Sequence, residues 1–158
     1  MEAVAARAGT AKPVLYRRWS DRSALLRDTL VPLAMEAIPH HDTGSYRDDM
    51  LAILRGWKTF FDSREGVIAP AIIGAIPHDP ELAAAFRDGV IRWRKDAMTE
   101  TIERAVSRGE VKPGVRVDVA RELGQALLWH RFLVTGDEIS DEFIEHVVDE
   151  VLIPYASA

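Results

Sequence analysis

The sequence predicts an all-α protein in which a small helix-turn-helix precedes a larger helical bundle. Three observations support this fold class. Apolar residues recur with the spacing of amphipathic helices along most of the 158 residues, and the alternating pattern of strands is nearly absent. Capping residues and breaks that contain Gly or Pro divide the chain into about eight helical segments. Charge is also uneven, because residues 1–30 carry six basic and three acidic side chains while the whole chain has a net charge of −5.

The first two predicted helices are short and are separated by a glycine. An alanine-rich helix covers residues 1–8 and ends at Gly9. A second helix covers residues 12–19 and begins with Lys12-Pro13, where proline is favourable because the first N–H groups of a helix have no partner. Two short helices joined by a tight turn form a helix-turn-helix, whose second helix enters the major groove of DNA.

A third helix is predicted to begin at the Ser-Asp capping pair, residues 20–21, and to extend to about residue 38. The segment 39–44, Pro-His-His-Asp-Thr-Gly, is the strongest break in the chain. We therefore expect two units. Residues 1–39 form the helix-turn-helix and a connecting helix, and residues 40–158 form a larger helical domain for effector binding and dimerisation.

The second unit divides into five predicted helices. They cover about residues 45–64, 66–76, 80–108, 118–135 and 140–154. Asp79, Asp118 and either Ser140 or Asp141 precede or open three of these helices as N-cap residues. Segment 66–76 is almost wholly apolar, and a helix that is apolar all round is expected to be buried on all sides.

Composition argues against several classes of protein. The chain has no cysteine, so it has neither a disulfide framework nor a thiolate site, and this fits the reducing cytoplasm where we expect the protein to act. No apolar run approaches the ~20 residues that cross a bilayer, and the N-terminus lacks the pattern of a signal peptide. A basic segment ahead of an acidic body is typical of a protein that contacts a polyanion at one end.

The N-terminal segment also carries a specific combination of motifs. Its turn has the form A-x-x-A-G at residues 5–9, its second helix ends with Leu-Tyr-Arg-Arg-Trp at 15–19, and a capped helix with Leu-Leu follows at 25–26. This combination resembles the DNA-binding region of the tetracycline-repressor (TetR) family. Residues 127–136, LLWHRFLVTG, are similar to a stretch found in many members. The resemblance implies a bacterial one-component transcriptional regulator with an all-α effector-binding and dimerisation domain.

The resemblance also implies which residues contact double-stranded operator DNA. The candidate DNA-binding residues are Thr10, Lys12, Val14, Tyr16, Arg17 and Arg22. Lys12 and Arg22 lie at helix starts, where cations and free N–H groups can both engage phosphate. The Tyr16 hydroxyl can donate to a phosphate, and Val14 can pack on a thymine methyl group. Members of the family have a longer helix before this segment, so we expect the unit to lack its first helix and to bind DNA weakly as written.

Large side chains in the central helices indicate an effector pocket. The candidate ligand-binding residues are Trp57, Phe61, Trp93, Met98, Trp129 and His130. Small-molecule sites are mostly apolar with a few polar groups, and His130 is the polar member of this set. The alternative is that these side chains belong to the hydrophobic core and bind no ligand. For each aromatic residue taken alone, the core role is the better interpretation.

The last two predicted helices have wide apolar faces. The candidate dimer-interface residues are Leu123, Leu127, Val134, Phe143, Val147 and Val151. A terminal helix that is apolar on more than one side indicates a partner. The resemblance implies that these helices pair with those of a second copy to form a homodimer.

No catalytic motif, cofactor motif or metal-ligand spacing stands out. The histidines at 40–41 and 78 lie in separate loops without a second cluster of ligands, so we expect no metal, no cofactor and no enzymatic activity. The leading hypothesis is a repressor that binds its operator as a homodimer and is released by a small apolar effector. The alternative is a helical small-molecule-binding or protein-interaction module that does not bind DNA in this form.

Overall fold

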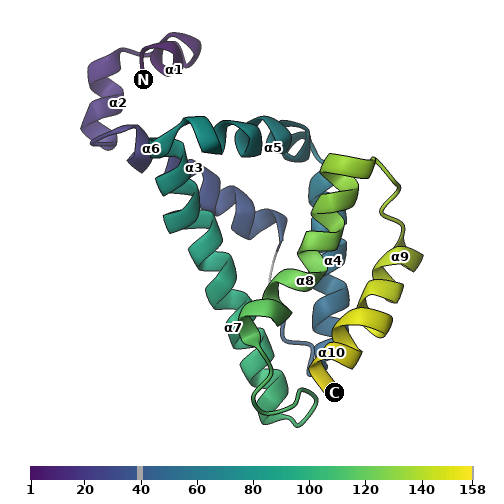
Figure 1. Ribbon diagram of the computed structural model, residues 1–158. Coiled ribbons are helices and arrows are strands. Elements are labelled where there is room, and N and C mark those ends of the chain that lie inside the picture. Colours follow the sequence, from purple (N-terminus) through teal and green to yellow (C-terminus); the bar gives the residue numbers. More distant parts are fainter. Residues whose placement is uncertain (39–40, 158) are drawn as a thin grey trace.

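The computed structural model describes residues 1–38 and 41–157, and every regular element in this part of the chain is helical (Figure 1). The predicted all-α class is confirmed. The α-helices are α1 (Glu2–Arg7), α2 (Lys12–Arg18), α3 (Arg22–Ala37), α4 (Tyr46–Asp62), α5 (Arg64–Ala75), α6 (Pro80–Phe86), α7 (Arg92–Ser107), α8 (Val117–His130), α9 (Asp141–His146) and α10 (Ile153–Ser157). Turns of different pitch join or extend them at η1 (Ile76–His78), η2 (Arg87–Ile91), η3 (Arg131–Thr135) and η4 (Val147–Leu152). The expected boundary between residues 39 and 40 lies outside the described residues.

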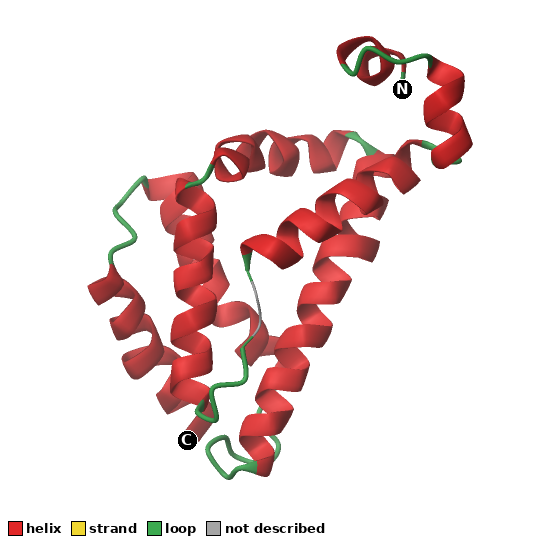
Figure 2. Ribbon diagram, turned by 180° about the vertical axis from the view of Figure 1, so that it is seen from behind, coloured by secondary structure: helices red, strands yellow, loops and turns green. Residues whose placement is uncertain are grey.

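The helices α1 and α2 lie at one end of the molecule, and α3 leads from them into the body (Figures 1 and 2). The rod formed by α6, η2 and α7 runs along one side of the body. On the other side α4 packs against α8, and α9 and η4 pack against α4. In Figure 1, α5 runs along the top edge between the end of α4 and the start of α6. Within the described ranges, no helix combines the length and apolarity that a membrane span requires.

The main core lies where α4, α7, α8 and the C-terminal helices meet. Apolar positions of the predicted helices supply it, as amphipathic patterning requires. The largest fully buried apolar side chains are Tyr46, Met50, Ile53, Ile102, Val111, Leu128, Ile144 and Val148. Because these side chains come from elements far apart in the sequence, the bundle is held together by long-range packing.

Most predicted N-caps form, and one does not. The side chains of Asp21, Asp79 and Ser140 each accept a hydrogen bond from the N–H three residues later, at 2.8, 3.0 and 3.1 Å. The predicted cap at Asp118 is wrong, because Arg116 holds the N-cap position and Asp118 lies in the first turn of α8. Its carboxylate lies 2.8 Å from the Arg116 guanidinium instead of accepting from the helix backbone.

The apolar helix α5 is buried on one side only, so the prediction of complete burial for residues 66–76 is wrong. Ala69 is buried, but the side chains of Val67 and Ile68 are 76% and 52% exposed. The helix packs against α4 and η1 and runs along the edge of the body (Figure 1). One stripe therefore faces inward while the opposite stripe faces outward.

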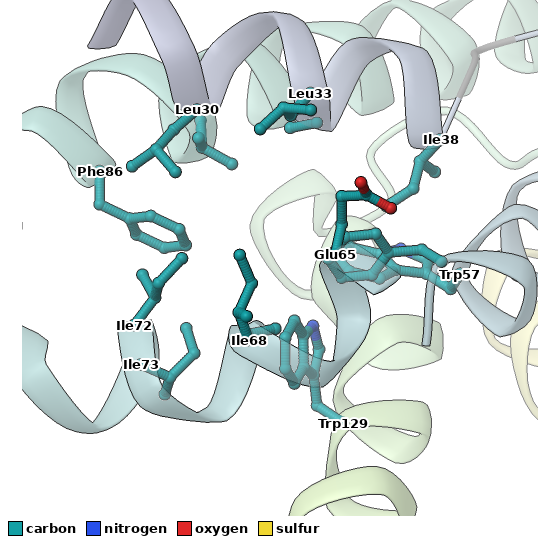
Figure 3. Close-up of a pocket in the computed structure, with 14 residues that line it drawn as sticks. Leu30, Leu33, Ile38, Trp57, Glu65, Ile68, Ile72, Ile73, Phe86 and Trp129 are labelled. Carbon is teal, nitrogen blue, oxygen red and sulfur yellow. The ribbon is translucent and has the colours of Figure 1, made fainter. Parts of the chain in front are cut away.

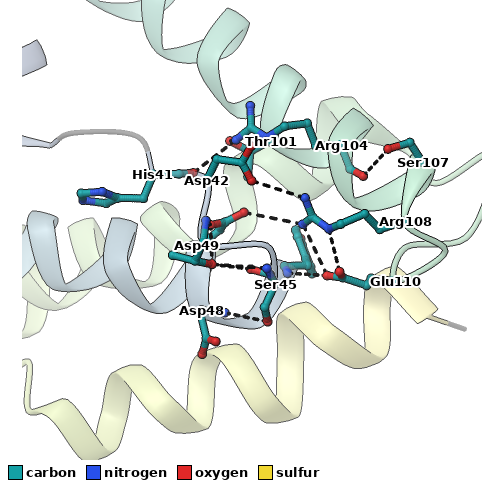
Figure 4. A network of polar contacts seen from close by, with 12 residues as sticks. His41, Asp42, Ser45, Asp48, Asp49, Thr101, Arg104, Ser107, Arg108 and Glu110 are labelled. Carbon is teal, nitrogen blue, oxygen red and sulfur yellow. Dashed lines mark hydrogen bonds and ion pairs between the residues drawn. The ribbon is translucent and has the colours of Figure 1, made fainter.

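A buried carboxylate fastens the start of α4 to the end of α7 (Figure 4). Asp49 is fully buried, and its Oδ1 accepts hydrogen bonds from the backbone N and the Oγ1 of Thr43, at 2.7 and 2.8 Å. Its Oδ2 lies 3.7 Å from Nη2 of Arg108. The Arg108 Nε donates to Glu110 at 2.7 Å, and Glu110 accepts from the backbone N of Tyr46. These contacts join the 41–45 loop, α4 and α7 in one polar network.

The junction of α4 and α5 leaves no room for a side chain at Gly66. A Cβ added there would overlap the carbonyl oxygen of Phe60 and lie 2.6 Å from that of Phe61. We expect Gly66→Ala to lower the free energy of unfolding by about 1–3 kcal/mol, because backbone atoms must move to admit the methyl group. Chemical denaturation measures this change.

The matched control lies in the same helix. Gly74→Ala adds the same methyl group at a place where nothing lies within 4 Å of the new Cβ. We expect it to stabilise the protein by about 0.5–1 kcal/mol, since alanine is the better helix former. Equal stability of the two variants would contradict the tight junction at Gly66.

Candidate functional site

The surface of α2 carries basic, aromatic and apolar side chains. Leu15 is buried, whereas Val14 and Tyr16 are each 44% exposed. Lys12 and Arg17 are exposed on the same helix. Four of the six predicted DNA-binding residues therefore lie on an accessible helix at the end of the molecule, while Thr10 is half-buried in the turn before it.

Two of the predicted phosphate ligands already hold carboxylate partners. The Lys12 Nζ lies 2.7 Å from the Glu2 carboxylate, which raises the pKa of Lys12 above its ordinary value. Nη1 of Arg22 lies 2.6 Å from the carboxylate of Asp79, the N-cap residue of α6. Arg22 thus joins the start of α3 to the start of α6, a structural role that the sequence did not indicate. Phosphate binding by either cation requires exchange with, or sharing of, this partner.

The orientation of α2 is tied to that of α3. At the end of α2, the Trp19 Nε1 donates to the Asp28 carboxylate of α3 at 3.0 Å. At the start of α3, Ser23 Oγ donates to the backbone oxygen of Glu81 at 3.3 Å, and the neighbouring Arg22 pairs with Asp79. A shift of α3 relative to the body would therefore carry the exposed face of α2 with it.

A mostly apolar cavity lies in the body between α3, α5 and the α6–η2 rod, with α4 and α8 at its base (Figure 3). Its volume is about 90 Å³. The lining residues are Leu30, Leu33, Ala34, Ile38, Trp57, Phe60, Glu65, Ile68, Ala69, Ile72, Ile73, Phe86, Val90 and Trp129. A concave apolar site with few polar groups is the usual form of a small-molecule pocket.

The cavity is lined by only part of the predicted set of ligand-binding residues. Trp57 and Trp129 line it, with their ring centroids 5.3 Å apart. Phe61 lies behind them, stacked on Phe132 at 4.2 Å and on Trp57 at 5.5 Å. These aromatic rings form one cluster at the base of the cavity, and Phe61 supports the wall without lining it.

Three predicted pocket residues lie elsewhere. Trp93 lines a separate, open depression between α3 and the rod, together with Trp19 and Arg27. Met98 is buried lower in the core, where it lines a separate space of about 10 Å³. His130 is exposed on α8 and does not line the cavity. His130 follows the cavity residue Trp129 directly, and adjacent residues on a helix face different directions.

The residues that the prediction missed come from α3, α5 and the α6–η2 rod. The apolar stripe Leu30, Leu33 and Ala34 belongs to the helix that follows the helix-turn-helix, and Ile72 and Ile73 belong to the apolar helix α5. The apolarity of α5 was the available signal, but it was read as complete burial. No feature of the sequence showed that these two helices face each other across a space.

A buried guanidinium lies behind one wall of the cavity. Arg94 is 5% exposed, and its Cζ lies 4.6 Å from the centroid of the Trp57 ring. Its Nε donates to Gln125 at 2.9 Å, and burial lowers the pKa of Arg94 to about 10. The positive charge therefore lies below the aromatic base of the cavity, outside its lining.

The predicted dimer residues divide between surface and core. Leu127, Val134 and Val151 are 37%, 71% and 36% exposed on α8, η3 and η4. Leu123 and Phe143 are half-buried and pack against the core. Val147 is 3% exposed inside the chain's own core, so its side chain does not reach a partner surface in this conformation.

The metal prediction concerned the two loop histidine segments. Among the residues that the structure describes, no group of three or more His, Cys, Asp or Glu side chains could hold a metal ion. His40 lies outside the described residues. No described feature indicates a site for a metal ion.

Comparisons with known proteins agree on one family. A family model described as "Tetracyclin repressor-like, C-terminal domain" matches residues 40–151. The HTH-type transcriptional regulator YdeS of Bacillus subtilis is 28% identical over 94% of this chain and 75% of its own length. The DNA-binding transcriptional repressor TetR of Mycobacteroides abscessus is 31% identical over 97% of this chain and 80% of its own. The crystal structure of the TetR family transcription regulator SCO0332 superposes with a TM-score of 0.78, at 31% identity, over 96% of this chain and 84% of that one.

Proposed function

The chain belongs to the tetracycline-repressor-like family of transcriptional regulators, and from this premise we propose that it binds operator DNA as a homodimer and releases it when a small apolar molecule enters the cavity. Members of the family are DNA-binding regulators without enzymatic activity. One observation carries the ligand-responsive part of the proposal. The helix α3 both lines the cavity and leads directly from α2, the helix with the exposed basic and aromatic face.

The DNA-binding step is assigned to α2. Arg17 and Lys12 provide positive charge, and the Tyr16 hydroxyl and Val14 methyl groups provide a donor and an apolar contact for a major groove. Two copies of α2 in a symmetric dimer can occupy successive grooves only at one spacing. Any change in the orientation of α2 relative to the dimer interface therefore alters operator affinity.

Coupling to a ligand follows from the size of the cavity and from its walls. Pockets for drug-sized ligands are commonly about 300–1,000 Å³, whereas this cavity is about 90 Å³. A ligand of that size must displace at least one wall as it enters. The wall residues Leu30 and Phe86 belong to α3 and α6, the helices whose starts are joined by Arg22 and Asp79. Ligand entry then shifts the population towards a different α3–α6 arrangement and moves α2 with it.

A repressor role is supported by one relative. The protein from Mycobacteroides abscessus that matches 97% of this chain is described as a transcriptional repressor. Under this proposal the DNA-bound state blocks transcription, and the ligand-bound state permits it.

The test is fluorescence anisotropy on the DNA upstream of the protein's own gene, measured over a series of salt concentrations. We expect binding that prefers this sequence over scrambled DNA, with log K falling linearly against log salt because phosphate contacts release counterions. Lys12→Ala should weaken binding to both DNAs and reduce the salt slope by about 1.

Arg64→Ala is the matched control, since it removes one exposed positive charge on α5, away from α2. We expect it to leave the salt slope unchanged. Sequence-independent binding, or no binding at low salt, would favour the alternative of a helical ligand-binding module instead.

A further inference from the structure

We infer that the effector is a lipophilic cation whose charged group lies beside Glu65 at the mouth of the cavity. The inference rests on the proposed function, because it names the ligand class of the same cavity. It depends on one carboxylate in an otherwise apolar lining, in which no described residue supplies a basic side chain.

Glu65 is the one ionisable side chain among the described residues that line the cavity. It lies in the first turn of α5, and its carboxylate is beside Ile38 and Trp57 (Figure 3). No ion pair or hydrogen bond joins this carboxylate to a described residue, although most other acids near helix starts in the body have such partners. An apolar lining with one unpaired carboxylate is complementary to a hydrophobic molecule with one positive charge.

A second depression shows where the cavity opens. It is lined by Leu33, Glu36, Thr59, Phe60, Ser63 and Glu65. Three of these residues, Leu33, Phe60 and Glu65, also line the cavity, so the two spaces adjoin at Glu65. The route to solvent thus passes a second acid, Glu36, and no basic side chain of a described residue lines either space.

A positive charge lies behind the Trp57 ring, outside the lining of the cavity. The Arg94 guanidinium lies over the Trp57 ring, and its nearest polar partner is the neutral Gln125. A ligand cation on the Trp57 ring would be repelled by this group, whereas a cation in the adjoining depression lies next to Glu36 and Glu65. We therefore expect the charged group of the ligand at the opening beside Glu65 and its apolar part within the apolar lining.

The aromatic walls favour the same class of ligand. Trp57, Phe60 and Trp129 line the cavity, and indole and phenyl faces attract alkyl groups next to a quaternary nitrogen. A carboxylate ligand entering by this route would meet Glu36 and Glu65 and would lose its hydration without a described basic partner.

The experiment compares three probes of equal chain length: octyltrimethylammonium, 1-octanol and octanoate. Isothermal titration calorimetry on the full chain measures each dissociation constant. We expect octyltrimethylammonium to bind about tenfold more tightly than octanol, and octanoate to bind more weakly than both. Glu65→Gln should raise the dissociation constant of the cation about tenfold and change that of octanol less than about twofold.

Glu103→Gln is the control for the overall acidity of the protein, because it removes an exposed charge on α7 that lines neither space. We expect it to leave all three dissociation constants unchanged. Equal affinity for the cation and octanol would overturn the inference, and so would an equal loss of cation affinity in Glu65→Gln and Glu103→Gln. In either case, operator binding and its release by octanol would still support the proposed function. Failure of all three probes to bind would also overturn the inference. The proposed binding to operator DNA would then be tested separately by the anisotropy measurements over a series of salt concentrations.

Discussion

Replacing Leu127 and Val134 by glutamate is expected to convert the protein into a monomer and to lower its operator affinity by about 100-fold or more. These side chains are 37% and 71% exposed on α8 and η3, next to the exposed Leu133. Apolar side chains gathered on the surface of one chain indicate an interface, and two buried like charges on each copy would oppose its formation. A monomer contacts a single half-site, so it loses the gain that two linked binding events provide.

Sedimentation equilibrium measures the oligomeric state, and fluorescence anisotropy measures the operator affinity. The matched control places the same two charges at Met35 and Val67, which are 47% and 76% exposed on α3 and α5. We expect that control to remain dimeric. A control that dissociates while the Leu127 and Val134 variant does not would show that the interface lies on the α3–α5 side of the molecule.

Asp49→Ala is expected to lower the free energy of unfolding by about 2–4 kcal/mol. The substitution leaves the Thr43 N–H and hydroxyl without their acceptor, and it removes the buried charge that faces Arg108. These contacts hold the loop before α4 against the end of α7 (Figure 4). Chemical denaturation with far-ultraviolet circular dichroism measures the loss.

Two further variants locate the source of the effect. Asp48→Ala removes an exposed neighbour whose ion pair with Arg47 spans 3.8 Å, and we expect a change within about 0.5 kcal/mol. Asp49→Asn keeps an oxygen acceptor for Thr43 but removes the charge, so an intermediate loss is expected. If Asp49→Ala is as stable as Asp48→Ala, the network does not stabilise the fold.

Local chemistry was sufficient to predict most of the helices. Gly9 adopts a positive φ of 62° at the turn between α1 and α2, and Asp21, Asp79 and Ser140 cap the helices that follow them. These features depend on a few adjacent residues. The wrong cap at Asp118 also has a local cause. A carboxylate near a helix start can pair with a neighbouring Arg116 as readily as it can accept hydrogen bonds from the helix backbone.

The sequence predicted only part of the cavity lining. Composition identified Trp57 and Trp129 as large side chains in the central helices, and both line the cavity. It also selected Trp93, which lines a separate depression between α3 and the α6–η2–α7 rod. The sequence does not state which side of a rod faces the bundle when both sides carry aromatic residues.

The sequence by itself determined the all-α class, the helix-turn-helix and the family resemblance, because these depend on residue spacing within single helices. Only the tertiary structure decided that α3 and α5 face each other across an apolar space, that Glu65 lies at its mouth, and that Arg22 pairs with Asp79. Each of these facts depends on the rotation and distance between helices far apart in the chain. Rotation and distance are set by the packing of whole helix faces, and that packing is not encoded in any short stretch of residues.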